Sequence, residues 1–141
     1  GSHQIIGFMF NDGFRNLTEL EDELMRPLEP GEPDPQSEPN PIAAGYFSEE
    51  GFYPINACKP DPLFDGLLDP FVVKQSHYAE IKTLPPDFEL IATNGNCPIQ
   101  AMKHTSRPLY GTQFHPEAYV DVYPHGRKIL KNFFRIAGIL P

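Results

Sequence analysis

The distribution of apolar and polar residues divides the chain into short strands and a few helices. Short runs of β-branched and aromatic residues predict strands over residues 52–56, 71–78, 88–93, 99–104 and 109–114. Pro54 lacks an N–H donor, which favours a sheet edge for the first of these strands. Turn residues such as Asn94-Gly95 separate the last three strands, so an antiparallel meander is their simplest connection.

Helical spacing of apolar residues appears in four places. The run from Ile5 to Phe10 predicts the opening of a buried helix, and residues 16–25 predict a short amphipathic one. A single helical turn is expected over residues 61–67, ended by Gly66. Between Gly126 and Leu140 an apolar stripe faces away from basic residues, which indicates a helix covering the sheet. The stripe consists of Ile129, Leu130, Phe133, Phe134 and Ala137.

Residues 26–42 form a proline-rich stretch in a chain that holds 17 prolines. Because proline removes a backbone donor and fixes φ, this stretch predicts an extended loop without helix or central strand. Two interpretations stay open. The loop is either a flexible connector or a wall at the rim of an active site, since loops of this length rarely lack a role.

Composition narrows the classes of function. The 141 residues amount to one domain or less, with 19 acidic against 11 basic residues and a net charge of -8. Such a chain repels phosphate backbones, which argues against nucleic acid as a partner. It holds no apolar run near 18 residues and no signal peptide. Cys58 and Cys97 predict neither a disulfide framework nor a metal site, so we expect a cytoplasmic protein with reduced thiols and without a metal or organic cofactor.

The stretch from Pro108 to Glu117 carries the candidate chemistry. Pro116 ends the last predicted strand beside His115, which places His115 and Glu117 at a strand mouth. In an extended chain, side chains two residues apart point to the same side. The Glu117 carboxylate could therefore orient the His115 imidazole and leave its other ring nitrogen to act as a base. Taken alone, the tripeptide also fits a surface histidine near a turn glutamate.

The run Tyr110-Gly111-Thr112-Gln113-Phe114-His115-Pro116-Glu117 resembles the YGxQFHPE signature of class I glutamine amidotransferases. The resemblance continues in register over about residues 61–138. It implies the C-terminal part of a flavodoxin-like α/β domain, a mixed sheet with flanking helices, in which residues 1–141 form one partial domain. It also implies that His115 and Glu117 complete a catalytic triad with a cysteine.

The family motif around that cysteine is similar to G-x-C-x-G-H-Q. Aligning His3-Gln4 with its end places Gly1 just after the cysteine, which falls before the first residue of this sequence. The resemblance makes the Gly1 N–H an oxyanion donor. Residues 1–3 also match the remnant that a cleaved affinity tag leaves. Cys58 and Cys97 lie in turn or core contexts, and neither is expected to replace the nucleophile.

Substrate-binding residues follow from the same resemblance. Ser76-His77 is similar to the Ser-His pair near the donor pocket, and Gln4 matches the glutamine of the elbow. Judged on residue type alone, His77 fits a core position equally well. His104, with basic neighbours and no nearby carboxylate in sequence, is expected at the surface.

The resemblance implies hydrolysis of the γ-amide of glutamine, or of a γ-glutamyl amide, by a Cys-His-Glu triad. Without its cysteine the chain as given is expected to be inactive. Its expected partners are glutamine or a γ-glutamyl small molecule, and a synthase subunit or a chain that supplies preceding strands. Two alternatives stay open: a non-catalytic binding module, and a poorly folded fragment with an exposed sheet edge.

Overall fold

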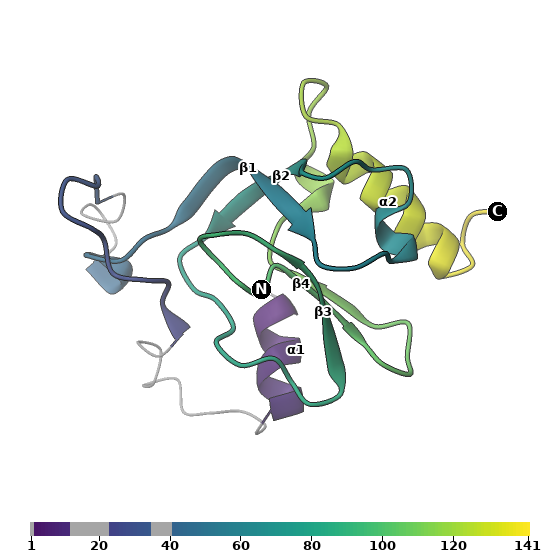
Figure 1. Ribbon diagram of the computed structural model, residues 1–141, viewed down its shortest axis with the longest axis horizontal. Helices are drawn as coiled ribbons and strands as arrows, with labels where there is room; N and C mark the ends of the chain where they lie inside the picture. Colours follow the sequence, from purple (N-terminus) through teal and green to yellow (C-terminus); the bar gives the residue numbers. More distant parts are fainter. Residues whose placement is uncertain (1, 12–22, 35–40) are drawn as a thin grey trace.

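The computed structural model describes residues 2–11, 23–34 and 41–141, which form a five-stranded sheet with a helix on each face (Figure 1). The strands are β1 (Glu49–Ala57), β2 (Phe71–His77), β3 (Phe88–Thr93), β4 (Ala101–His104) and β5 (Tyr110–Thr112). Their order is β2-β1-β3-β4-β5, and all four pairings are antiparallel. The predicted α/β class and the predicted meander of β3, β4 and β5 are confirmed.

Two helices cover the two faces of the sheet. Ile129 of α2 (His125–Ile136) belongs to a core with Ile55 and Phe71, whereas Phe10 of α1 (Ser2–Asn11) packs against a second core that contains Met102. Neighbouring residues of a strand point to opposite faces, which is how β4 contributes to both cores. The predicted C-terminal helix is thus confirmed, although it ends at Ile136.

Within the described part of the chain, three short 3-10 helices lie between these elements. They are η2 (Pro41–Ala43), η3 (Pro62–Phe64) and η4 (Pro116–Ala118). Asp61 caps η3 by accepting a hydrogen bond from the Leu63 N–H at 2.9 Å, and Gly66 follows with a φ of 77°, as the predicted helical turn requires. The helix η4 follows β5 after residues 113–115 and carries Glu117.

The prediction of an edge strand around Pro54 was wrong, because β1 lies between β2 and β3. Pro54 is opposite Val72 of β2, and the Val72 N–H donates to His125 of α2 instead of to β1. Pro54 and Val72 therefore form a non-hydrogen-bonded pair of the antiparallel ladder. The backbone nitrogen of Pro54, which carries no hydrogen, faces away from β2. On that other side β1 pairs with β3 only at Asn56 and Ala57, so the proline interrupts no ladder.

The expectation of a surface position for His104 was also wrong. His104 is opposite Phe88 in the pairing of β3 with β4 and is buried. Its ring packs edge-on against Phe10 and Phe88, while Nδ1 accepts a hydrogen bond from the Ser106 N–H at 3.1 Å. Contacts from α1, distant in sequence, decide this burial.

The segment before β1 matches its predictions in part. Residues 16–22 of the predicted amphipathic helix lie outside the described residues, and Leu24, within the predicted range, forms an isolated bridge to Ala79. Within residues 26–42, the described parts contain η2 and a turn at Pro30-Gly31, and the Leu28 N–H donates to the Gly45 carbonyl at 2.9 Å. The loop thus runs beside the entry to β1, and residues 35–40 lie outside the described residues.

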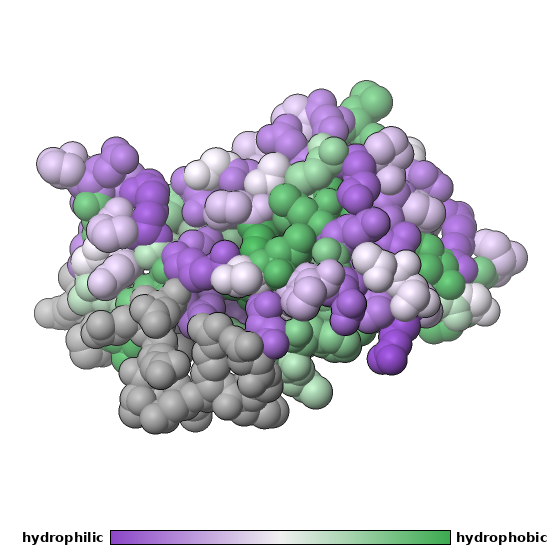
Figure 2. All heavy atoms as spheres, turned by 60° about the horizontal axis from the view of Figure 1, so that its bottom comes forward, coloured by the Kyte–Doolittle hydropathy of each residue, from purple (hydrophilic) through white to green (hydrophobic). Residues whose placement is uncertain are grey.

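The surface combines charged and apolar areas. On the face shown in Figure 2, hydrophobic residues gather near the middle and hydrophilic residues surround them. Large apolar side chains that are exposed include Met9 on α1 and Val122 before α2. Among the described residues, no helix has the length and apolar character needed to cross a membrane.

Candidate active site

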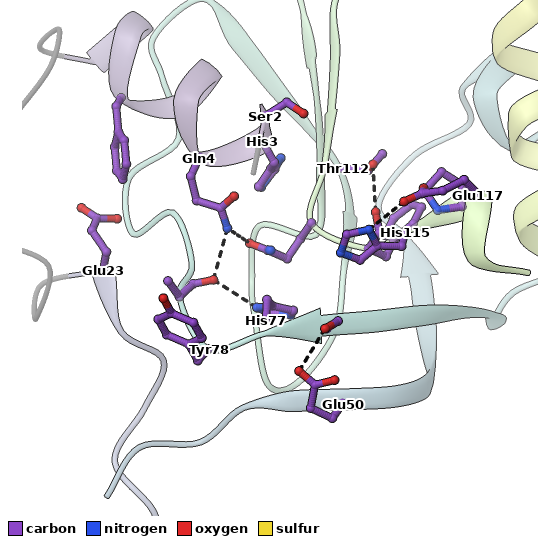
Figure 3. Close-up of a pocket in the computed structure, with 16 residues that line it drawn as sticks. Ser2, His3, Gln4, Glu23, Glu50, His77, Tyr78, Thr112, His115 and Glu117 are labelled. Carbon is purple, nitrogen blue, oxygen red and sulfur yellow. Dashed lines mark hydrogen bonds and ion pairs between the residues drawn. The ribbon is translucent and has the colours of Figure 1, made fainter. Parts of the chain in front are cut away.

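One open cavity of about 810 Å³ collects every described candidate residue. It lies where the first turn of α1, the end of β2 and the segment after β5 meet (Figure 3). The candidates that line it are Gln4, Ser76, His77, His115 and Glu117. Gly1, the expected oxyanion donor, lies outside the described residues. The sequence therefore identified residues from separate segments that the fold brings together.

His115 and Glu117 form a direct pair, with Nδ1 2.8 Å from the Glu117 Oε1. Pro116 is the first residue of η4, and this turn brings the carboxylate back to the ring. The sequence argument placed both residues on an extended strand, but the observed geometry comes from the 3-10 turn. No described residue hydrogen-bonds the other ring nitrogen, Nε2. This arrangement suits a general base, because Glu117 orients the ring through Nδ1 and Nε2 can accept a proton.

The main chain fixes the position of His115. Its N–H donates to the Lys74 carbonyl at 2.8 Å, which forms an isolated bridge to β2. The segment after β5 therefore reaches β2, the strand at the other edge of the sheet. The side chains of His115 and Glu117 remain 44% and 62% exposed, so a ligand in the cavity has access to the imidazole.

Gln4 reaches the cavity from α1. Its Nε2 donates to the Gln113 Oε1 at 2.9 Å and to the Ala79 carbonyl at 3.3 Å (Figure 3). Gln113 belongs to the signature around His115, but sequence reasoning gave it no role of its own. Two amide side chains from distant segments thus form one wall of the cavity.

Ser76 and His77 occupy different environments at the end of β2. Ser76 is exposed, and its hydroxyl donates to the Glu50 Oε1 at 3.1 Å. The His77 ring is buried, with Nδ1 3.1 Å from the Ala79 carbonyl oxygen and Nε2 3.1 Å from the Glu49 Oε1. Both ring nitrogens of His77 therefore already have protein partners.

A further histidine, His3, lines the same cavity and was not singled out from the sequence as a site residue. It is only 4% exposed, and its Nε2 lies 3.2 Å from the Ile99 carbonyl oxygen. Burial lowers the pKa of His3 from 6.5 to about 4, so its ring is neutral at physiological pH. A side chain on Gly111 would collide with this ring, which explains the glycine inside β5. The signal in the sequence that could have identified His3 as a site residue is its place beside Gln4 in the family motif.

Neither cysteine lines the cavity. Cys58 is exposed at the end of β1, and Cys97 is buried in the turn between β3 and β4. Burial raises the pKa of Cys97, and the carboxylates of Glu80 and Glu49 raise it further. These environments favour the protonated thiol over the thiolate that a nucleophile needs.

The one group of potential metal ligands among the described residues is Glu49, His77 and Cys97, whose ligand atoms lie within 4.8 Å of one another. Glu49 already accepts hydrogen bonds from Gln100 at 2.9 Å and Asn94 at 2.7 Å, besides its contact with His77. The carboxylate is therefore satisfied by the protein itself, and this geometry does not call for an ion.

Comparisons with known proteins agree on one family. The sequence model of the family Glutamine amidotransferase class-I matches residues 48–137. A glutamine-hydrolyzing GMP synthase subunit from Pyrococcus abyssi is 41% identical over 99 residues, which are 70% of this chain and 52% of the relative. The protein of the same name from Methanosphaera stadtmanae is 44% identical over 82 residues, which are 58% and 43% of the two chains.

A solved structure shares the fold of this chain. It is the crystal structure of a protein from Thermoplasma acidophilum that is described as a GMP synthase subunit, with a TM-score of 0.59 and 37% identity. The match covers 65% of this chain and 45% of that one. This chain spans about half the length of the curated relatives it matches.

Proposed function

The chain belongs to the class-I glutamine amidotransferases, and on that premise we propose that it supplies the base, the orienting acid and the amide-binding wall of a glutaminase site. The reaction is hydrolysis of the γ-amide of glutamine or of a γ-glutamyl amide by a Cys-His-Glu triad. One observation carries the proposal. The His115 Nδ1 lies 2.8 Å from the Glu117 Oε1 at a cavity that the first turn of α1 also lines.

The proposed chemistry needs a thiolate, a proton carrier and oxyanion donors. The His115 Nε2 takes the proton of the cysteine thiol, and the thiolate attacks the amide carbon. His115 then gives the proton to the leaving ammonia, and water hydrolyses the γ-glutamyl thioester in the same way. Glu117 accepts the Nδ1–H and stabilises the imidazolium formed in both half-reactions. The backbone N–H of Gly1 keeps its proposed role as one oxyanion donor.

Gln4, Ser76 and His77 are proposed to surround the amino-acid end of the substrate. Gln4 and the exposed Ser76 offer polar groups to the cavity, and main-chain groups near Ser76 and His77 suit a carboxylate. The His77 ring is buried and engaged on both nitrogens, which supports an indirect role for its side chain.

The nucleophile is not among the cysteines of these 141 residues. Because Cys58 and Cys97 lie outside the cavity, we expect this polypeptide to show no glutamine hydrolysis. A version extended upstream through an elbow cysteine should release ammonia from glutamine, and replacement of that cysteine by serine should abolish the release. Turnover by the 141 residues that disappears when Cys58 or Cys97 is mutated would overturn the proposal.

The names of the relatives suggest a partner for the site. Each is named as one subunit of a synthase, so we propose that ammonia passes from this site to a partner synthase chain. An exposed hairpin follows the catalytic pair: Val120 and Tyr123 form an isolated bridge, and Val122 at its tip is 79% exposed. An apolar side chain at a turn tip is unusual, and it suits a contact with another protein.

The alternative function is a non-catalytic binding module derived from the same family. It would appear as an extended, cysteine-containing form that binds glutamine without hydrolysing it. That residues 1–141 are one partial domain and that the protein is cytoplasmic remain predictions. The net charge of -8 continues to argue against nucleic acid as a partner.

A further inference from the structure

A buried polar cluster lies behind the cavity wall. Its members are Glu49 on β1, Gln75 and His77 on β2, Asn94 after β3, and Gln100 before β4. Glu49, Gln75 and Gln100 are each 0% exposed. A fully buried carboxylate is costly unless several donors surround it. Glu49 is not part of the sequence signature, so its burial requires a reason of its own.

Three donors converge on the Glu49 carboxylate. Gln100 Nε2 donates to Oε1 at 2.9 Å, Asn94 Nδ2 donates to Oε2 at 2.7 Å, and the His77 Nε2 lies 3.1 Å from Oε1. The orientation of Asn94 is fixed, because its Oδ1 accepts hydrogen bonds from the N–H groups of Asn96 and Cys97. The carboxylate thus faces donors on both oxygens.

The surroundings of His77 determine where its protons lie. The Ala79 carbonyl can only accept, so the Nδ1 that faces it carries a proton. The Nε2 faces a carboxylate oxygen of Glu49 at 3.1 Å. Both ring nitrogens therefore lie against acceptors, and removal of the carboxylate frees the ring to rotate or to change its tautomer.

The cluster reaches Gln4 by two routes. On one side the Ala79 carbonyl that contacts His77 also accepts from the Gln4 Nε2 at 3.3 Å (Figure 3). On the other side the Gln113 N–H donates to the Gln100 carbonyl at 2.8 Å, and the Gln113 side chain accepts from Gln4. Gln4 is therefore held between two groups that both connect back to Glu49.

We propose that Glu49 is a positioning residue for the substrate-binding wall of the cavity. It fixes the His77 ring, which contacts the Ala79 carbonyl, and it anchors Gln100, whose main-chain carbonyl accepts from the Gln113 N–H. Ala79 and Gln113 in turn hold Gln4 in place. The inference rests on the proposed function for the identity of the ligand, a small molecule with the amino-acid end of glutamine. The contacts that hold Gln4 in place are made by the described residues and do not depend on the identity of the ligand.

Replacement of Glu49 by Gln tests the proposal because it keeps the shape of the side chain and replaces one of its two acceptor oxygens with an amide donor. The amide –NH2 of the new side chain would meet either the fixed Asn94 donor or the Gln100 donor. Gln100 is oriented by the Gln75 Nε2, which donates to its Oε1 at 2.8 Å. Either orientation of the new amide leaves two donors facing each other, so the cluster must rearrange. Glu89→Gln is the matched control, because Glu89 is exposed and pairs with Lys59.

The experiment uses the full chain and two nuclear magnetic resonance readouts. In the wild type, the ring spectrum of His77, identified with His77→Gln, should show a protonated Nδ1. The side-chain amide signals of Gln4 and Gln113 should shift in Glu49→Gln and stay unchanged in Glu89→Gln. Titration with L-glutamine should show a loss of affinity of about tenfold in Glu49→Gln alone.

The outcomes separate this inference from the proposed function. An unprotonated Nδ1 in the wild type would overturn the inference, and this result does not depend on whether Glu49→Gln folds. Unchanged Gln4 and Gln113 signals in a folded Glu49→Gln protein would overturn it as well. If the wild type does not bind L-glutamine, the proposed ligand is wrong, whereas shifted amide signals would still support the positioning role.

Discussion

Gly126 in the first turn of α2 lies directly against the carbonyl of Pro116 in η4. A Cβ atom at this glycine would overlap the carbonyl oxygen, which is backbone and cannot rotate away. The start of the helix and the turn that carries Glu117 are therefore in close contact. The glycine is required by this contact, since its φ does not lie in the left-handed region.

We expect Gly126→Ala to destabilise the protein by about 1–3 kcal/mol, because an added methyl group forces η4 and α2 apart. The same displacement should lengthen the contact between His115 and Glu117. Urea unfolding measures the first effect, and the His115 ring signals measure the second. Gly95→Ala is the control, because nothing lies within 4 Å of the corresponding Cβ and stability should stay nearly constant.

The pairing of His115 with Glu117 leads to a kinetic prediction. In a cysteine-containing extended form, His115→Gln should lower kcat for glutamine hydrolysis by about 10²- to 10⁴-fold, as expected for loss of a general base. Glu117→Gln should lower kcat less, because the imidazole remains and loses only its orienting acceptor. Both side chains are largely exposed, so the free energy of unfolding should change little. Equal activity of wild type and His115→Gln would contradict the assignment.

The sequence predicted which residues gather around the cavity better than it predicted the burial of single residues. Local signals sufficed for the strands and for the end of the last strand near His115, because proline and β-branched residues act within a few positions, but they did not show the 3-10 turn that follows. The position of His104 depended on Phe10, which is far away in sequence, and residue type alone could not show that contact. Pro54 was misplaced because the edge rule concerns hydrogen bonds on one side of a strand, and the pairing of β1 leaves that side open.

The polar cluster around Glu49 was also beyond the reach of sequence reasoning. Its members come from four segments, and the glutamate and the amide residues resemble ordinary surface residues by type. Only the antiparallel register, which sets Glu49 opposite His77, places them together inside the protein. Burial of charged and amide groups is decided by such long-range pairing, and the motif around His115 carries no information about it.

The hairpin after η4 offers a test of the proposed partner. Val122→Asp places a charge at its exposed tip and should weaken binding to a partner synthase chain from the same organism by at least about tenfold. Because the tip makes few contacts within the chain, the melting temperature should hardly change. Leu68→Asp is the matched control, since Leu68 is 86% exposed and follows η3 instead of the pair His115 and Glu117. Equal losses in both variants would argue against a specific surface.

The buried ring of His3 should make stability depend on pH. Its pKa is about 4 in the folded protein and 6.5 in an unfolded chain, so the unfolded state binds more protons between these values. Stability is therefore fully present above pH 6.5, falls as the pH decreases to about 4, and then levels off for this group. The whole loss is about 3 kcal/mol at 1.4 kcal/mol per pKa unit.

Because other groups also titrate in acid, the comparison is between wild type and His3→Asn in urea unfolding at a series of pH values. The difference between the two proteins should shrink as the pH falls from 7 to 4, and a constant difference would show that the ring is not held neutral.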